Sequence, residues 1–227
     1  ESGKVECGHW FYKEMITSGS LPNVFGSHEV ACALYGDDIM KQIEEFENVV
    51  HSMPSILRVH SLNNLLRFLF DIGKHDEATI VFNRLKSNFS NQSEEHKKTL
   101  TWNIDSYRIY IFGMYKLGHV VNAMEMYKEL LRRGPKPTND ISSFLLLNLS
   151  SEKLVDEALD VCKHIIKCRD PIGFDAQKCF FTMLRVEKHL DIACKLFITM
   201  RKKRCIYDDS DFVSLVGFND DKDGLKS

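Results

Sequence analysis

Cysteine and histidine side chains are the residues of this sequence best suited to do chemistry, so their spacing is considered first. The seven cysteines lie at irregular intervals and form no C-x-x-C pair, so neither a zinc knuckle nor a redox pair is indicated. The P-C-x-x-C segment of a zinc deaminase is absent for the same reason. The nine histidines show no H-E-x-x-H pattern. We therefore expect no enzyme activity, no catalytic residue, no metal site and no cofactor.

Composition narrows the class of protein further. The 227 residues are 44% hydrophobic and 27% charged, which is typical of a soluble, folded chain. No apolar run approaches the roughly 18–20 residues that a membrane-spanning helix needs, so we expect no membrane partner. An odd number of irregularly spaced cysteines suits reduced thiols in a reducing compartment. The chain begins at Glu1, and we expect any targeting peptide to lie outside it.

The elements that position these residues follow an internal repeat. One type of octet starts with alanine and has bulky or apolar residues at +3, +4 and +7, which places one stripe on one helix face. Its copies are ATIVFNRL (78–85), AMEMYKEL (123–130), ALDVCKHI (158–165) and ACKLFITM (193–200). The last three copies start 35 residues apart, and the polar stretch near 87–98 indicates an insertion between the first two.

A second octet precedes each of these by sixteen residues. Its copies are LNNLLRFL (62–69), YRIYIFGM (107–114), SSFLLLNL (142–149) and QKCFFTML (177–184). The unit is therefore a first helix, a short inner turn, a second helix and a longer outer turn. The inner turns carry Gly73, Gly118, Lys153 and Lys188. In the outer turn RGPKPT, Gly134 is expected to end the helix in a left-handed conformation.

Helical hairpins of this kind cannot bury both apolar stripes alone, so neighbouring copies must stack. The sequence predicts an all-α fold, an α-solenoid of stacked helix-turn-helix hairpins over residues 1–208. We expect Cys162 and Cys194 to be small core residues, and stripe aromatics to serve packing rather than base stacking. The expected segments are a partial repeat at 11–23, repeats at 24–58, 59–103, 104–138, 139–173 and 174–208, and a capping or flexible acidic tail at 209–227.

Two families have helical hairpins of nearly this length. The tetratricopeptide signature Trp-x-x-Leu-Gly-x-x-Tyr is absent and the period is 35. The segments IDSYRIYIFGMYKLGHVVNAMEMYKELLRRGPKPT (104–138) and NLLRFLFDIGKHDEATIVFNRL (64–85) instead resemble pentatricopeptide (PPR) repeats of the P type. Shared features are an aromatic opening, a Lys-x-Gly turn, Asp-Glu-Ala before the second helix and a Gly-x-x-Pro end. The resemblance implies a right-handed superhelix.

The resemblance also implies a function. PPR proteins generally bind RNA in mitochondria or plastids, and such repeats read one base per repeat with two or three side chains. The first reading residue follows the aromatic near the start of the first helix, and the second is the last residue of the repeat. Carried over to this sequence, the pairs are Asn63 with Asn103, Arg108 with Thr138, Ser143 with Gly173, and Lys178 with Asp208.

Several positions depart from the family pattern. The position that normally offers an aliphatic side chain to sandwich a base holds His60, Asp105, Asp140 and Asp175. Carboxylates there would repel phosphates, although aspartate just before an apolar-periodic run is also a standard helix N-cap. On either interpretation, we expect no clean base code.

Basic residues gather at the turns. They could contact an RNA backbone without reading sequence, or they could be solvated helix ends favoured by the helix dipole. The backbone candidates are Lys116, Arg132, Arg133, Lys136, Arg201, Lys202, Lys203 and Arg204.

Two functions remain open on this sequence. The first is a non-enzymatic, RNA-associated protein of a mitochondrion or plastid, docking RNA within a larger ribonucleoprotein such as an organellar ribosome. The alternative is a protein–protein interaction scaffold built on a degenerate PPR solenoid. A net charge of −2 differs from the strongly basic balance of a dedicated nucleic-acid binder. The expected partners are RNA and other proteins of the assembly, with no small-molecule substrate.

Overall fold

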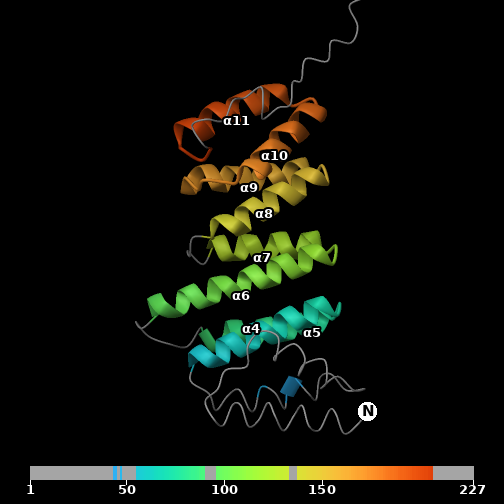
Figure 1. The fold of residues 1–227 in the computed structure, drawn as a ribbon, viewed down its shortest axis with the longest axis vertical. Helices are drawn as coiled ribbons and strands as arrows, with labels where there is room; N and C mark the ends of the chain where they lie inside the picture. The colour runs from blue at the N-terminus through green and yellow to red at the C-terminus, as the bar shows by residue number, and fades with distance from the viewer. Residues whose placement is uncertain (1–42, 45–46, 48–54, 90–95, 133–136, 207–227) are drawn as a thin grey trace, which may run out of the picture. The chain divides into compact units, whose positions relative to one another are not determined.

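A computed structural model describes residues 43–44, 47, 55–89, 96–132 and 137–206 of the chain (Figure 1). These residues contain eight α-helices and no strand, which confirms the all-α prediction. The helices are α4 (Ser55–Asp71), α5 (His75–Phe89), α6 (His96–Lys116), α7 (Val120–Arg132), α8 (Asn139–Ser151), α9 (Val155–Cys168), α10 (Phe174–Val186) and α11 (Leu190–Lys202). The predicted segments 11–23 and 209–227, and most of 24–58, lie outside the described residues.

The chain divides into two compact units, residues 1–135 and 136–227. In the first unit, α4 packs against α5 and α6, and α6 packs against α5 and α7. In the second unit, α8 packs against α9 and α10, and α10 packs against α11. In the part of the chain that the structure describes, each unit thus contains a pair of helical hairpins, as the repeat predicts. A right-handed superhelix over both units stays a prediction.

The inner turns share one backbone device. In the first hairpin, the Gly73 N–H donates to Phe70 O at 3.1 Å and the Lys74 N–H donates to Leu69 O at 2.7 Å. This pair of bonds is the Schellman motif, which needs a left-handed residue after the helix. The same two bonds recur in the other three inner turns. The left-handed residues have φ of 75°, 82°, 60° and 63° at Gly73, Gly118, Lys153 and Lys188.

The two lysines therefore keep a conformation that glycine adopts without steric cost. A side chain in the left-handed region costs about 1 kcal/mol, because Cβ approaches the backbone. The sequence alignment of the four hairpins places lysine in the later copies where glycine stands in the earlier ones. The shared left-handed conformation confirms this alignment at the inner turns.

Aromatic rings from three helices form the core of the first unit. Phe82 of α5 stacks on Tyr110 of α6 at 4.4 Å between centroids and meets Tyr107 edge-on at 5.1 Å. Phe70 of α4 meets Tyr110 edge-on at 5.6 Å. In the second unit, Phe181 meets Phe197 edge-on at 5.9 Å. The predicted packing role is confirmed, since these stripe aromatics are all buried: Tyr107, Tyr110, Tyr127, Phe180, Phe181 and Phe197.

The burial of the two cysteines predicted to lie in the core follows the apolar stripes of their helices, with one exception. Cys162 is fully buried, whereas Cys194 is exposed. The core prediction is wrong for Cys194, because it lies one position after the buried Ala193 on α11 and so leaves the apolar stripe. None of the described helices combines the length and apolar character that crossing a membrane requires.

Two neighbouring first helices approach closely at Gly113. A β-carbon on residue 113 would overlap the ring of Phe70, so the contact between α4 and α6 needs glycine there. The insertion predicted near 87–98 is partly helical, since α5 continues to Phe89 and α6 already begins at His96.

Gly113→Ala should destabilise the protein. Overpacking of this kind costs typically about 1–3 kcal/mol, against a helix-propensity gain of up to about 1 kcal/mol. The expected net result is a lower denaturant midpoint. Gly173→Ala is the control, since a β-carbon there meets nothing within 4 Å. An equal midpoint for both variants would contradict the close approach.

Thiol reactivity should follow burial. Burial, together with the nearby Cys205, raises the pKa of Cys162 to about 12, so its thiol stays protonated and shielded in the native state. Alkylation of the native protein followed by peptide mapping should label Cys194 rapidly, and Cys162 only after unfolding. Labelling of both at the same rate would show that the α9–α11 core is open.

Candidate functional site

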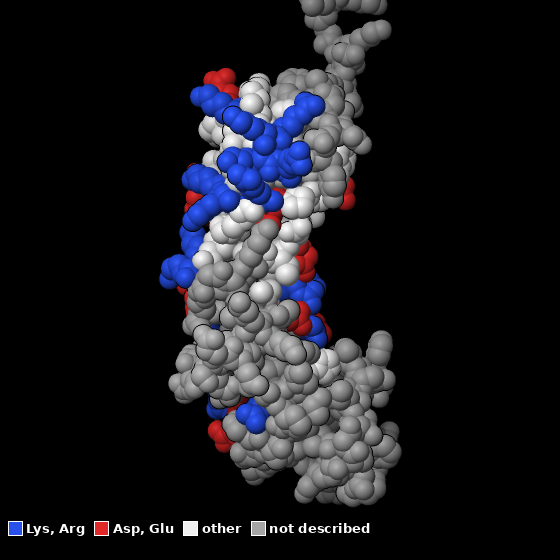
Figure 2. Space-filling view, turned by 90° about the vertical axis from the view of Figure 1, so that its left-hand side faces the viewer, with Lys and Arg blue, Asp and Glu red and all other residues white. Residues whose placement is uncertain are grey.

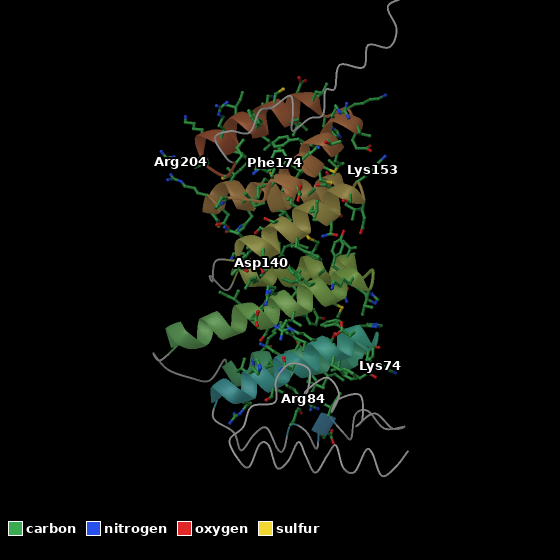
Figure 3. All side chains as sticks on the ribbon, in the orientation of Figure 1. Lys74, Arg84, Asp140, Lys153, Phe174 and Arg204 are labelled. Carbon is green, nitrogen blue, oxygen red and sulfur yellow. The ribbon has the colours of Figure 1, made fainter. Side chains whose placement is uncertain are left out.

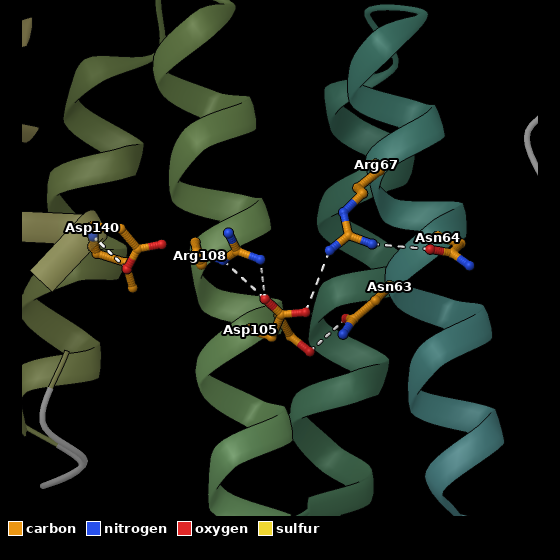
Figure 4. Close-up of polar contacts among 8 residues, drawn as sticks. Asn63, Asn64, Arg67, Asp105, Arg108 and Asp140 are labelled. Carbon is orange, nitrogen blue, oxygen red and sulfur yellow. Dashed lines mark hydrogen bonds and ion pairs between the residues drawn. The ribbon is translucent and has the colours of Figure 1, made fainter. Parts of the chain in front are cut away.

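A carboxylate in α6 holds two guanidinium groups (Figure 4). Asp105 accepts hydrogen bonds from Arg108 of its own helix through Nε, at 2.9 Å, and through Nη2. Its other oxygen lies 3.4 Å from Nη2 of Arg67 on α4. The Arg67 guanidinium also donates to Asn64 Oδ1 at 3.0 Å. Asp105 thus links the first helices of two successive hairpins.

The structure rules out one expected role for Asp105. A capping residue would stand at a helix start, but α6 begins at His96 and Asp105 lies well inside it. The N-cap prediction is wrong here because the insertion extends the helix toward the N-terminus. The N-cap prediction is also wrong for Asp140 and Asp175, because Thr138 and Gly173 are the N-caps of α8 and α10. Both aspartates lie in the first turns of these helices, one residue beyond the first helical residue. There, Asp140 Oδ1 accepts the Ile141 N–H at 3.0 Å.

Asn63 does not face a groove. Its side chain is 2% exposed and its Oδ1 accepts a hydrogen bond of 2.6 Å from Ser106 Oγ, which is fully buried (Figure 4). The amide therefore joins α4 to α6 inside the packed contact. The base-facing prediction is wrong for Asn63, because in this hairpin the register places the position against the next helix. Its predicted partner Asn103 lies outside the side chains that the structure describes.

Beside this network, an open pocket of about 230 Å³ lies between α4 and α6. Two residues predicted separately for RNA contact, Arg108 and Lys116, both line it. Sequence reasoning missed Arg67, although its spacing of four from Asn63 places it near the same helix face. The remaining lining residues are Phe70, Asp71, Ile109, Phe112 and Gly113. The pocket thus combines cations with aromatic rings.

In the second unit, one predicted pair meets. The Gly173 N–H donates to Ser143 Oγ at 3.3 Å, so the two positions face one another. Lys178 is exposed on α10, and Thr138 is the exposed N-cap of α8. Asp208 lies outside the described residues.

Basic side chains also meet at the outer turns. Lys202, Lys203 and Arg204 line an open pocket of about 480 Å³ together with Arg169. Arg169 was not predicted, although it lies 35 residues after Gly134 and 35 before Arg204 in the repeat register. Arg132 and Arg201 are exposed at the ends of α7 and α11, while Arg133 and Lys136 lie outside the described residues.

Metal chemistry finds no support in the part of the chain that the structure describes. No group of three or more histidine, cysteine, aspartate or glutamate side chains there could hold a metal ion. The basic side chains that line each of the two pockets are suited to binding anions.

Comparison with known proteins agrees with this geometry. Residues 105–135 match the family model for the PPR repeat, a segment that runs from Asp105 through the rest of α6 and α7. A search of curated protein sequences found no match. Together with the repeated hairpins, the match supports a pentatricopeptide repeat protein.

Proposed function

We propose that this chain is a non-enzymatic RNA-associated protein that docks RNA within a larger ribonucleoprotein of a mitochondrion or plastid. A PPR repeat implies RNA binding in general. The organelle, the assembly and the manner of docking are our proposal. It is supported by the pocket between α4 and α6, where Arg108 and Lys116 converge beside aromatic side chains.

The charge of this pocket favours phosphate over base recognition. Its cations are Arg67, Arg108 and Lys116, and its carboxylates are Asp71 in the lining and the adjacent Asp105. Three positive charges against two negative ones leave a weak net attraction for phosphate. Phosphate contacts position an RNA but carry no sequence information.

Base reading is further weakened by the contacts of the predicted code residues. The Asn63 oxygen is occupied by Ser106, and Arg108 is held by Asp105. A side chain already held by another residue must break that contact before it can pair with a base edge. These contacts therefore favour docking of RNA without a clean base code.

The overall balance of charge favours membership of an assembly. Thirty basic residues against thirty-two acidic ones provide no long-range attraction for RNA. Weak docking by one chain becomes stable when partners hold the same RNA, because later contacts form at high effective concentration. A chain of this charge therefore suits a ribonucleoprotein better than solitary RNA recognition.

Lys116→Ala should weaken binding of single-stranded RNA by the full chain. Loss of one phosphate contact lowers the slope of log K against log salt by about one, uniformly across sequences. Fluorescence anisotropy at several salt concentrations measures this slope. The matched control is Lys74→Ala, which removes another exposed lysine of the first unit that does not line the pocket.

Equal slopes for Lys116→Ala and Lys74→Ala would contradict docking at this pocket. If the unaltered chain binds no RNA at all yet co-purifies with proteins, the alternative of a protein-interaction scaffold is correct. RNA binding by the unaltered chain distinguishes these two outcomes.

Asp105→Asn should strengthen RNA binding. The change removes a negative charge beside the pocket and releases the guanidinium groups of Arg67 and Arg108 from their ion pairs. Both partners are more than a third exposed, so the stability loss should stay within about 1 kcal/mol. The control is Asp175→Asn, which removes the same charge from the first turn of α10. Weaker binding by Asp105→Asn would show that the carboxylate orders the site rather than opposing RNA.

A further inference from the structure

Two arginines occupy positions where the backbone favours glycine. Arg169 and Arg204 follow the ends of α9 and α11 with φ of 55° and 58°, in the left-handed region. Gly134 stands 35 residues before Arg169 in the repeat register. Residues in this conformation cluster at functional sites, although Lys153 and Lys188 share it at the inner turns, so the charge and contacts of this edge decide its role.

The two turns that carry these arginines are fixed to one another. The Ile172 N–H donates to Cys205 O at 3.1 Å, and Cys205 Sγ lies 3.6 Å from Ile165 O. Cys205, Ile172 and Ile206 are all buried beneath the turns. The backbone of the two turns is therefore tied together beneath the cations, so that less backbone has to be ordered when a ligand binds.

Exposed charge at the described part of this edge is of one sign, and Asp208 and Asp209 follow it outside the described residues. Residues 161–169 contain three lysines or arginines, residues 192–206 contain five, and neither stretch contains aspartate or glutamate. The nearby Asp170 is fully buried. Figure 2 faces this edge and shows lysine and arginine side chains gathered over the C-terminal part of the chain.

A helix dipole alone does not explain this arrangement. Cations are favoured near helix C-termini, and Lys167 and Arg201 already fill that role in the last turns of α9 and α11. The left-handed position lies at the same helix ends but opposes arginine sterically, a cost that a cation within the last turn avoids. Its two arginines instead line the pocket of about 480 Å³ with Lys202 and Lys203.

The pocket lining also indicates the kind of ligand. All four side chains are cations, and none offers an aromatic face on which an unpaired base could stack. Such a surface matches phosphates presented by a base-paired RNA helix, which proteins recognise through shape and backbone.

We infer that the outer-turn edge formed by Arg169, Lys202, Lys203 and Arg204 binds the phosphate backbone of base-paired RNA, independently of sequence. This inference rests on the proposed RNA association and adds a second contact, distinct from the pocket between α4 and α6. The edge would hold a helical segment of a structured RNA.

The test compares two double variants of the full chain. Arg169→Gly with Arg204→Gly removes two charges from the edge and relieves both left-handed residues. Lys153→Gly with Lys188→Gly removes the same charge and relieves the same conformation at the inner turns, at the opposite ends of the hairpins (Figure 3). Lys153 is 63% exposed in its ion pair with Glu187, so the control loses little stability.

Binding is measured with an RNA duplex of about 16 base pairs at several salt concentrations, with a single-stranded RNA in parallel. We expect the arginine pair of changes to lower the salt slope for the duplex by about two, with an unchanged or higher Tm. The lysine pair should leave the slope as it is. Single-stranded RNA should be affected less than the duplex.

Equal slopes for the two double variants, or a larger loss for single-stranded RNA, would overturn this inference alone. The proposed function would then still stand if Lys116→Ala weakened single-stranded binding. An unaltered chain that binds neither RNA would overturn both proposals. Binding to anionic vesicles in preference to the duplex would reassign the edge to a lipid surface.

Discussion

Side-by-side packing of successive first helices is the constraint on which the exposed chemistry of this protein depends. In the first unit, α4 meets α6 where Gly113 lies against Phe70 and Ser106 donates to Asn63. Residues at this contact are buried and satisfied by their neighbours. Residues beside it on the helix surface, such as Arg108, reach the pocket instead. Small shifts of register between two helices therefore decide which side chains are available to a ligand.

Much of the fold could be predicted because the repeat depends on the spacing of residues that are close in the sequence. Apolar spacing and a 35-residue period gave the hairpins and their aromatic core. The positions of the inner turns followed from aligning Lys153 with Gly118, whereas their left-handed conformation is shown by the structure. The extended start of α6 was missed, because the repeat register says nothing about residues inserted between copies. Cys194 was misplaced because a position next to a buried alanine can fall on either side of the stripe.

The candidate site could be predicted only in part. Arg108, Lys116 and the cations 202–204 were expected at ligand-facing positions, and each lines a pocket. The base-facing prediction for Asn63 was wrong because the family register does not reveal how closely two particular helices pack. The double ion pair of Asp105 was also invisible, because Arg67 lies in the preceding hairpin, 38 residues away. Pairing between hairpins needs coordinates, whereas patterns within one helix do not.

Partners in these contacts are never far apart along the chain. Asn63 and Ser106 are separated by 43 residues, and Cys205 and Ile165 by 40. Low contact order of this kind makes folding fast, because little loop entropy is lost before native contacts form. Within each unit, the second hairpin to leave the ribosome can thus fold onto the first within about one further repeat of synthesis, since domains fold from the N-terminus as they emerge. The apolar faces of the nascent helices are therefore exposed to solvent only briefly during synthesis.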